Sequence, residues 1–172
     1  MNRSEFRELV THMEWADTQT WRALGSTPAA ASDDRLRWLC HHSHLVRLIY
    51  LQAWRGDPFQ LTDLAAYSDL KSIEEWSRPY YAVVTAFAET VDESSFAEPV
   101  HFPWSEMIVE KFGKLLPATL SESVFQVFTH TAYHRGQIAT RIRELGGEPP
   151  AVDFIYWVWA GKPGPRASIT SS

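Results

Sequence analysis

The sequence predicts an all-α protein built as a four-helix bundle, followed by a short tail. Apolar residues recur at three- and four-residue steps over four long stretches, and segments rich in Gly, Pro and Asp separate these stretches. At 172 residues, with 45% hydrophobic and 13% aromatic content, the chain is the size of one domain and can bury a core without disulfides. We expect this domain to span residues 1–160 and a flexible tail to span residues 161–172.

The first two helices are predicted at residues 4–24 and 34–54. In the first, apolar positions such as Phe6, Val10 and Met13 are separated by polar residues. Gly25 and Pro28 end this pattern, and Ser32 or Asp33 can cap the helix that follows. A Gly then Pro signal at residues 56–58 ends the second helix.

The third helix is predicted at about residues 72–91, and the fourth begins after Pro117 and continues to residue 145. Ser72 and Glu75 fit a capping box, while Pro79 predicts a kink or a later start. Thr119 or Ser121 can cap the fourth helix. Between the two, residues 100–104 alternate in polarity, so we expect an irregular insertion there, or a small hairpin with residues 108–114.

The aromatic segment at residues 154–159 is expected to pack over one end of the bundle or in a dimer interface. The polar residues 162–172 that follow it are expected to fray.

Composition narrows the classes of partner. The net charge is −5, and Lys and Arg are scattered, so nothing in the charge pattern predicts nucleic-acid binding. Cys40 is the single cysteine, which excludes an internal disulfide and favours a reducing compartment. No segment approaches the ~20 apolar residues of a membrane-spanning helix. We expect a cytoplasmic protein with neither a nucleic-acid partner nor a membrane association.

Two of the seven histidines, His130 and His134, lie four residues apart in the fourth helix. This spacing places both imidazoles on one helix face, where both can reach a metal ion at ~2.0–2.1 Å. Glu does not follow the first His, so the zinc-protease motif is absent. The alternative is a surface coincidence or a hydrogen-bonded core pair, but burial of two imidazoles without partners is costly, and a metal removes that cost.

The third ligand must come from another segment, and residues 41–44 (HHSH) are the obvious source. If the second helix faces the interior through Trp38, Leu48 and Leu51, then His41 and His44 lie on or beside this stripe, and His42 points about a third of a turn away. We therefore predict a divalent metal ion on His44, His130 and His134, built from facing helices.

Several strings resemble the DinB family of DinB/YfiT-like metalloenzymes, and together they cover nearly the whole chain. The most specific is HTAYHRGQI at residues 130–138, joined by LGGEPP at 145–150 and DFIY at 153–156. WAD at residues 15–17 matches an early motif of the family, and His44 matches a His about a dozen residues before a Gly, here Gly56.

The resemblance implies up-down-down-up connectivity, metal ligands matching His44, His130 and His134, and commonly a homodimer. The metal in the family is nickel, zinc or another divalent ion. Members of assigned activity include thiol-dependent transferases and isomerases that use mycothiol or bacillithiol, which implies a small-molecule substrate, and a low-molecular-weight thiol as a candidate.

Three neutral imidazoles leave a coordination position open, as in catalytic sites. The leading hypothesis is activation of a small thiol for attack on a small electrophile. Gln137 can hydrogen bond to the bound ligand, and Arg135 and Arg141 are candidates to hold a carboxylate, although both also fit a solvated helix surface.

Two other functions remain open. Metal-assisted hydrolysis needs a general acid or base, and no carboxylate shares the stripe of His130 and His134. A non-catalytic, stress-related binding protein would use the metal only to join two helices.

The carboxylates that can orient the histidine ligands are Glu14, Asp17 and Asp153, and the sequence does not show which of them does so.

Overall fold

The computed structural model describes residues 1–167, and every regular element in this part of the chain is helical. The α-helices are α1 (Arg3–Gly25), α2 (Asp34–Arg55), α3 (Leu70–Ser77), α4 (Pro79–Thr90), α5 (Ser105–Phe112), α6 (Leu120–Glu144) and α7 (Phe154–Trp159). Three short 3-10 helices lie at Pro28–Ser32, Leu64–Ala66 and Glu93–Ala97. The all-α class predicted from the sequence is confirmed.

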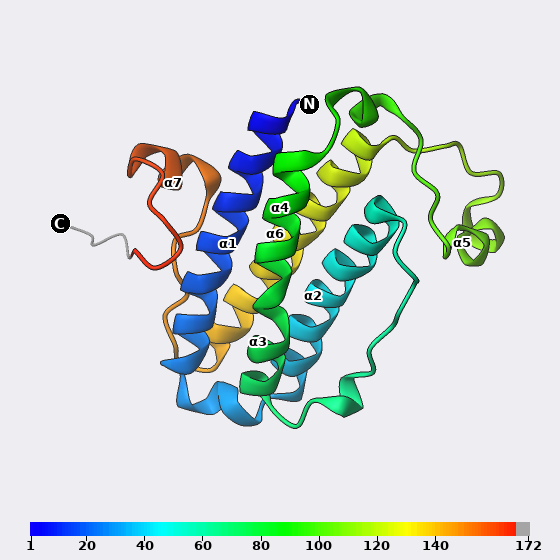
Figure 1. Cartoon of the computed structure of the whole chain (residues 1–172). Coiled ribbons are helices and arrows are strands. Elements are labelled where there is room, and N and C mark those ends of the chain that lie inside the picture. Colours follow the sequence, from blue (N-terminus) through cyan, green and yellow to red (C-terminus); the bar gives the residue numbers. More distant parts are fainter. Residues whose placement is uncertain (168–172) are drawn as a thin grey trace.

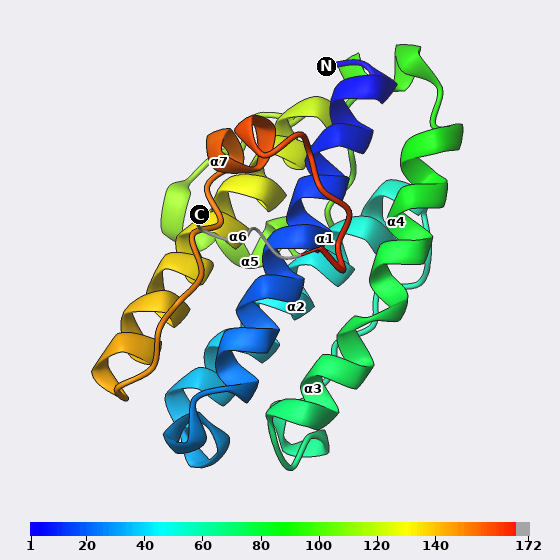
Figure 2. The same ribbon diagram turned by 90° about the vertical axis from the view of Figure 1, so that its left-hand side faces the viewer.

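Four long segments run side by side: α1, α2, the α3–α4 pair and α6 (Figures 1 and 2). In Figure 1, α1 and α6 descend, whereas α2 and the α3–α4 pair ascend. Helix α2 packs on α6 and on α3, while α1 packs on α4 and α6. The long helices that carry the candidate ligands, α2 and α6, are therefore direct neighbours.

The predicted caps of α2 and α6 are confirmed. Asp33 accepts a hydrogen bond from the backbone N–H of Leu36, and Gly56 ends α2 with a positive φ of 67°. Thr119 and Glu122 form a reciprocal capping box at the start of α6. These local signals fix where the helices begin and end, and hence the height of each histidine in the bundle.

The third predicted helix is broken in two. It begins earlier than predicted, because the capping box joins Asp69 to Ser72 rather than Ser72 to Glu75. Pro79 opens α4, where its missing N–H costs nothing, and Arg78 between the two helices keeps helical angles. The later start that Pro79 suggested is thus the start of α4.

The expected hairpin in the insertion is wrong. Residues 105–112 form helix α5, and the extended pairing in the described insertion is one isolated antiparallel bridge between Pro99 and Thr119. The alternation at residues 100–104 reflects aromatic packing instead, since the rings of Phe102 and Trp104 both lie against Tyr50 of α2.

Buried apolar side chains form two main clusters among the long helical segments. One, around Phe6, Val84 and Val124, joins α1, α4 and α6 near one end. The other, around Leu36 and Ile142, joins α2 to α6 near the opposite end. Neither cluster includes the candidate metal ligands, so a core exists on both sides of them.

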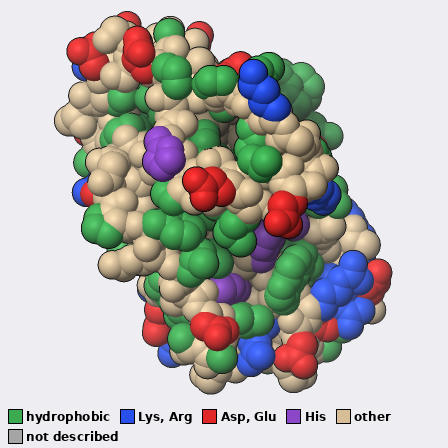
Figure 3. All heavy atoms as spheres, turned by 90° about the vertical axis from the view of Figure 1, so that its right-hand side faces the viewer, with side chains coloured by type: hydrophobic (Ala, Val, Ile, Leu, Met, Phe, Trp, Pro, Cys, Tyr) green, Lys and Arg blue, Asp and Glu red, His purple; other side chains and the backbone are tan. Residues whose placement is uncertain are grey.

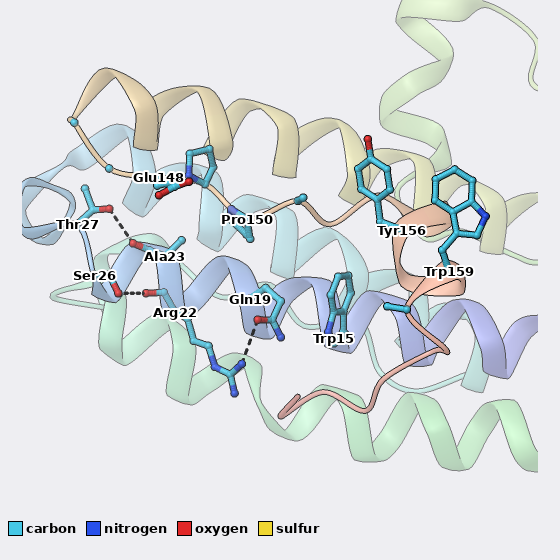
Figure 4. A pocket seen from close by; sticks show the side chains of 15 residues that line it. Trp15, Gln19, Arg22, Ala23, Ser26, Thr27, Glu148, Pro150, Tyr156 and Trp159 are labelled. Atoms are coloured by element: carbon cyan, nitrogen blue, oxygen red, sulfur yellow. Dashed lines mark hydrogen bonds between the residues drawn. The ribbon is translucent and has the colours of Figure 1, made fainter. Parts of the chain in front are cut away.

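The C-terminal segment crosses the outer face of α1 (Figure 2). Trp157 of α7 packs on Trp15, and the carbonyl oxygen of Ala167 accepts hydrogen bonds from Trp15 and Gln19 at 3.2 and 2.9 Å. Residues 161–167, assigned to the expected flexible tail, thus lie along the bundle, and the last five residues of that tail fall outside the described residues. Between this segment and α1 lies a groove of about 1040 Å³ (Figure 4).

No helix of the described chain combines the length and apolar character needed to cross a bilayer.

Candidate metal centre

The pair on α6 is arranged as its spacing predicts. His130 and His134 lie one turn apart, and their Nε2 atoms approach to 3.1 Å. Tetrahedral coordination at ~2.0–2.1 Å places ligand nitrogens ~3.4 Å apart, so this separation suits a shared metal. His134 is buried and His130 is half-buried, which places the site at the edge of the bundle rather than on its surface.

The third histidine of the cluster is His42 on α2. Its ring centroid lies 5.2 Å from that of His130 and 4.8 Å from that of His134. One ring nitrogen from each of His42, His130 and His134 lies within 4.8 Å of the other two. Small side-chain rotations close this triangle to the spacing of a metal site, so the residues present fit a divalent ion.

His44, which the sequence analysis places among the ligands, lies elsewhere. It is only 1% exposed, and its ring packs edge-on against Trp76 and Tyr80 at 4.4 and 5.6 Å. Trp38 is exposed, and the buried residues of α2 are Leu36, Leu39, Cys40, His41, Ser43, His44, Arg47 and Leu51. His41 and His44 are thus buried as expected, but the buried side of the helix lies away from Trp38. His42 and His44, about 200° apart around the helix, point to α6 and to the α3–α4 pair respectively.

Gln137 sets the tautomer of His134 instead of pointing to an open ligand position. Its Oε1 lies 2.7 Å from Nδ1 of His134, so the imidazole donates its Nδ1–H there and carries its lone pair on Nε2. That lone pair accepts a hydrogen bond from Nε2 of His130, and a metal bound by both rings would replace this hydrogen bond. Metal-binding histidines commonly use such an outer partner. Gln137 is thus a positioning residue for the candidate site.

The cluster favours neutral imidazoles. Burial, followed by the neighbouring His134, His42 and Arg47, lowers the pKa of His130 to about 4. Burial and the adjacent His134 and His41 lower the pKa of His42 as well. Neutral imidazoles are the form that binds metal, so both rings are ready to bind at neutral pH.

The cluster contains no carboxylate among the described residues. Nδ1 of His130 is buried and lacks a hydrogen-bond partner. A metal on Nε2 of His130 would require the proton to sit on this Nδ1. The site therefore consists of three imidazoles and one amide, with no negative charge of its own.

Of the three carboxylates considered as orienting groups, Asp17 instead joins a separate buried network. Its oxygens contact Arg47, Arg135 at 3.0 Å and the Tyr81 hydroxyl at 2.5 Å. Although burial opposes ionisation, Arg47, Arg135 and Tyr81 hold the pKa of Asp17 below its ordinary value. This network ties α1, α2, α4 and α6 together beside the cluster.

Other candidate residues are committed to other contacts. Arg141 pairs with Asp33 at 2.6 Å and Glu144 at 2.9 Å, and His12 contacts the carbonyl oxygen of Val152 at 3.0 Å. Burial strongly raises the pKa of the Cys40 thiol, so this thiol is not a nucleophile.

Exposed aromatic side chains flank the cluster. Trp38 stacks on His42 with ring centroids 4.9 Å apart and planes 4° from parallel, and it remains 49% exposed. Tyr133 meets His134 edge-on at 5.1 Å and is 64% exposed. Figure 3 shows histidine side chains at one face of the molecule, close to hydrophobic and acidic side chains. Trp38 and Tyr133 thus form an exposed aromatic surface beside the cluster.

The sequence analysis did not single out His42 or Arg47, and it did not predict that Gln137 contacts His134. His42 and His44 both lie about a dozen residues before Gly56, so this spacing does not show which of them belongs to the cluster. A usable signal was Trp38, four residues before His42, because a Trp–His pair at this spacing shares one helix face.

Comparison with known proteins identifies the family to which this chain belongs. The model of the DinB family matches residues 1–165. A search of curated proteins finds no match. DinB proteins bind metal, and the histidine cluster of this chain can hold one. Because the match covers almost the whole sequence, the chain belongs to the DinB family.

Proposed function

We propose that this protein is a divalent-metal-dependent enzyme that transfers a low-molecular-weight thiol to a small electrophile. The observation that carries the proposal is the cluster of His42, His130 and His134, which has no carboxylate among its members and in which a lowered pKa keeps His42 and His130 neutral. Zinc and nickel both suit imidazole ligands.

The charge of the site favours a thiolate. A bound divalent ion lowers the pKa of a coordinated thiol or water. Because the three imidazoles and Gln137 add no negative charge, the loaded site keeps the full charge of the ion. This charge would stabilise an anionic ligand such as a thiolate.

The surface around the cluster favours a partly apolar electrophile. The exposed faces of Trp38 and Tyr133 offer aromatic contact on either side of the histidines. Their role is to hold the electrophile beside the thiol and to exclude water.

Metal-assisted hydrolysis is the second candidate. It needs a group that takes or gives a proton near the attacking water. Asp17 is engaged by two arginines, and Gln137 cannot act as a base. A thiol bound to the ion would release its proton to solvent water, and its sulfur would then displace a leaving group, such as the chloride of monochlorobimane, so thiol transfer needs no protein base.

A non-catalytic metal protein is the third candidate. In it, the ion would only join α2 to α6. Those helices already share a buried cluster around Leu36, Leu39, Ile138 and Ile142. This independent packing favours catalysis over a structural role.

The proposal includes an assembly and a compartment. The long helical segments would form the closed up-down-down-up bundle of the family, and two copies would form a homodimer in the cytoplasm. Chemical cross-linking and sedimentation of the purified chain test the dimer directly.

The test of function uses protein purified without a metal-binding tag. Elemental analysis first gives the metal content. The protein is then assayed with cysteine, glutathione, bacillithiol and mycothiol, each with monochlorobimane as electrophile, and separately with p-nitrophenyl acetate. The His134→Ala variant is the control for the metal.

We expect thiol transfer by the parent protein and loss of both metal and transfer in His134→Ala, with helical circular dichroism retained. Ester hydrolysis without thiol transfer would support the hydrolase instead. No turnover on either panel, combined with a large loss of melting temperature on metal removal, would support the structural role.

A further inference from the structure

A second pocket lies on the opposite side of α2 from His42. It is about 490 Å³ and opens between α2, the start of α4 and the loop after α2. Its apolar wall consists of Leu48, Leu51, Trp76, Pro79 and Val83. A largely apolar concavity of this size is typical of sites for small molecules.

Two residues that line this pocket carry polar atoms without partners. Nδ1 of His44 and the hydroxyl of Tyr80 are both buried behind the pocket wall, and neither has a hydrogen-bond partner. The two residues are 1% and 4% exposed, and their rings meet edge-on at 5.6 Å. Buried polar groups in native proteins nearly always have hydrogen-bond partners, so two neighbouring residues with unpaired polar atoms need an explanation.

The mouth of the pocket carries no unbalanced charge. Arg55 pairs with Asp57 at 3.0 Å. Oε1 of Gln52 accepts the backbone N–H of Gln60 at 3.0 Å. Since the charges at the rim cancel and the floor is apolar, an ion gains little by entering.

We propose that this pocket binds a small uncharged molecule with an aromatic or aliphatic body and one hydroxyl group. The body packs against Trp76, Leu48 and Val83, and the hydroxyl supplies the partner that His44 and Tyr80 lack. A hydroxyl suits this role because it donates and accepts, so it can serve an imidazole nitrogen and a phenol together.

Binding requires the side chains of Tyr80 and His44 to turn so that both polar atoms face the pocket, and hydrogen bonding to the ligand offsets the cost of this change. The site is separate from the histidine cluster, and the inference does not depend on the proposed thiol chemistry.

The test compares p-cresol with toluene, which differ by one hydroxyl. Each is titrated into the full chain, and binding is followed by backbone amide NMR shifts of residues 48–52 and 76–83. Tyr80→Phe and His44→Phe remove one polar group each and keep a ring. Tyr67→Phe is the matched control, since Tyr67 packs on Trp76 at 4.9 Å but does not line the pocket.

We expect p-cresol to bind a few fold to about tenfold more tightly than toluene, the range that one net hydrogen bond provides. Tyr80→Phe and His44→Phe should reduce this preference, and Tyr67→Phe should keep it. Without ligand, Tyr80→Phe should be at least as stable as the parent, because it removes an unpaired hydroxyl. Equal binding of the two probes, shifts confined to other residues, or a preference unchanged in Tyr80→Phe would overturn the proposal.

Discussion

At the scale of single residues, the candidate site depends on which histidine of α2 faces α6. His42 contacts both histidines of α6, whereas His44 lies against Trp76 and Tyr80. The two histidines are close in sequence but differ in environment. Substitution of His42 should therefore affect metal binding, and substitution of His44 should affect stability.

His42→Ala should remove most of the bound metal and leave the unfolding free energy of the metal-free protein nearly unchanged, because His42 is only half-buried. His44→Ala should keep the metal and lose roughly 2–4 kcal/mol of stability, as large core side chains do when truncated. Metal content and denaturant unfolding of the metal-free proteins measure both. Loss of metal from His44→Ala with retention in His42→Ala would contradict the site described here.

The contact of Gln137 with His134 leads to a prediction about metal affinity. Gln137→Ala removes the acceptor of the His134 Nδ1–H and should weaken metal binding by about 10–100-fold. Gln137→Glu keeps an acceptor and should retain most of the affinity. Competition with a chromophoric chelator measures the change. Gln126→Ala, an exposed amide on the same helix, is the control and should bind metal as the parent does.

The sequence could predict two of the three clustered histidines, because their four-residue spacing within one helix fixes their relative placement. The third depends on how α2 is rotated about its own axis. That rotation turns the charged side chain of Arg47 inward, where it meets Asp17. Because charged residues are seldom buried, the apolar pattern of the sequence does not reveal it.

At the scale of elements, the Asp17 network holds the helices in register. Asp17 on α1 contacts Arg47 on α2, Tyr81 on α4 and Arg135 on α6. A buried ion pair adds little to the stability of a protein compared with an apolar contact of the same size. Removal of one partner, however, leaves the other charge buried without a counter-charge, which is costly. Here two cations share one anion, so the anion is the sensitive position.

Asp17→Asn should destabilise the protein by about 3–5 kcal/mol, because it leaves two guanidinium groups without their counter-charge. Urea unfolding at pH 7 measures the loss. Lys71→Ala is a suitable control, since its ion pair with Glu75 is exposed and 3.9 Å long. A change below 1 kcal/mol in Asp17→Asn would show that the network does not hold the bundle.

The same network predicts an acid dependence. The pKa of Asp17 is lower in the folded protein than its ordinary value of 3.8. Its stabilising contribution is therefore complete above pH 3.8 and is lost as the pH falls through the lower folded value. Acid unfolding of the parent should steepen in this range, and Asp17→Asn should show a shallower dependence there. Identical slopes for the two proteins would contradict this assignment.

Helix ends were predicted where a local cap decides them, as at Asp33, Gly56 and Thr119. Helix α5 was not, because its eight residues have no side-chain cap and follow an aromatic alternation that imitates a strand. Tertiary packing of Phe102 and Trp104 on Tyr50, which the sequence does not reveal, decides that segment.

At the scale of the whole molecule, the question is whether the bundle needs its metal. The core clusters around Phe6 and Leu36 lie on both sides of the histidines and contain none of them. The four long segments therefore share a packed interior that does not depend on the site, unlike small domains that fold only around an ion.

Removal of the metal should leave the fold intact and lower the melting temperature only moderately. An ion held at a hundred times its dissociation constant stabilises the native state by about 2.7 kcal/mol. For a chain of this size that corresponds to roughly 5–11 °C. Chelator treatment followed by calorimetry and circular dichroism measures it, with re-addition of metal as the control for reversibility. Because the histidines lie at the edge of α2 and α6, we expect activity to vanish while the helical signal persists. Unfolding on chelation would instead make the ion part of the core and the site a structural one.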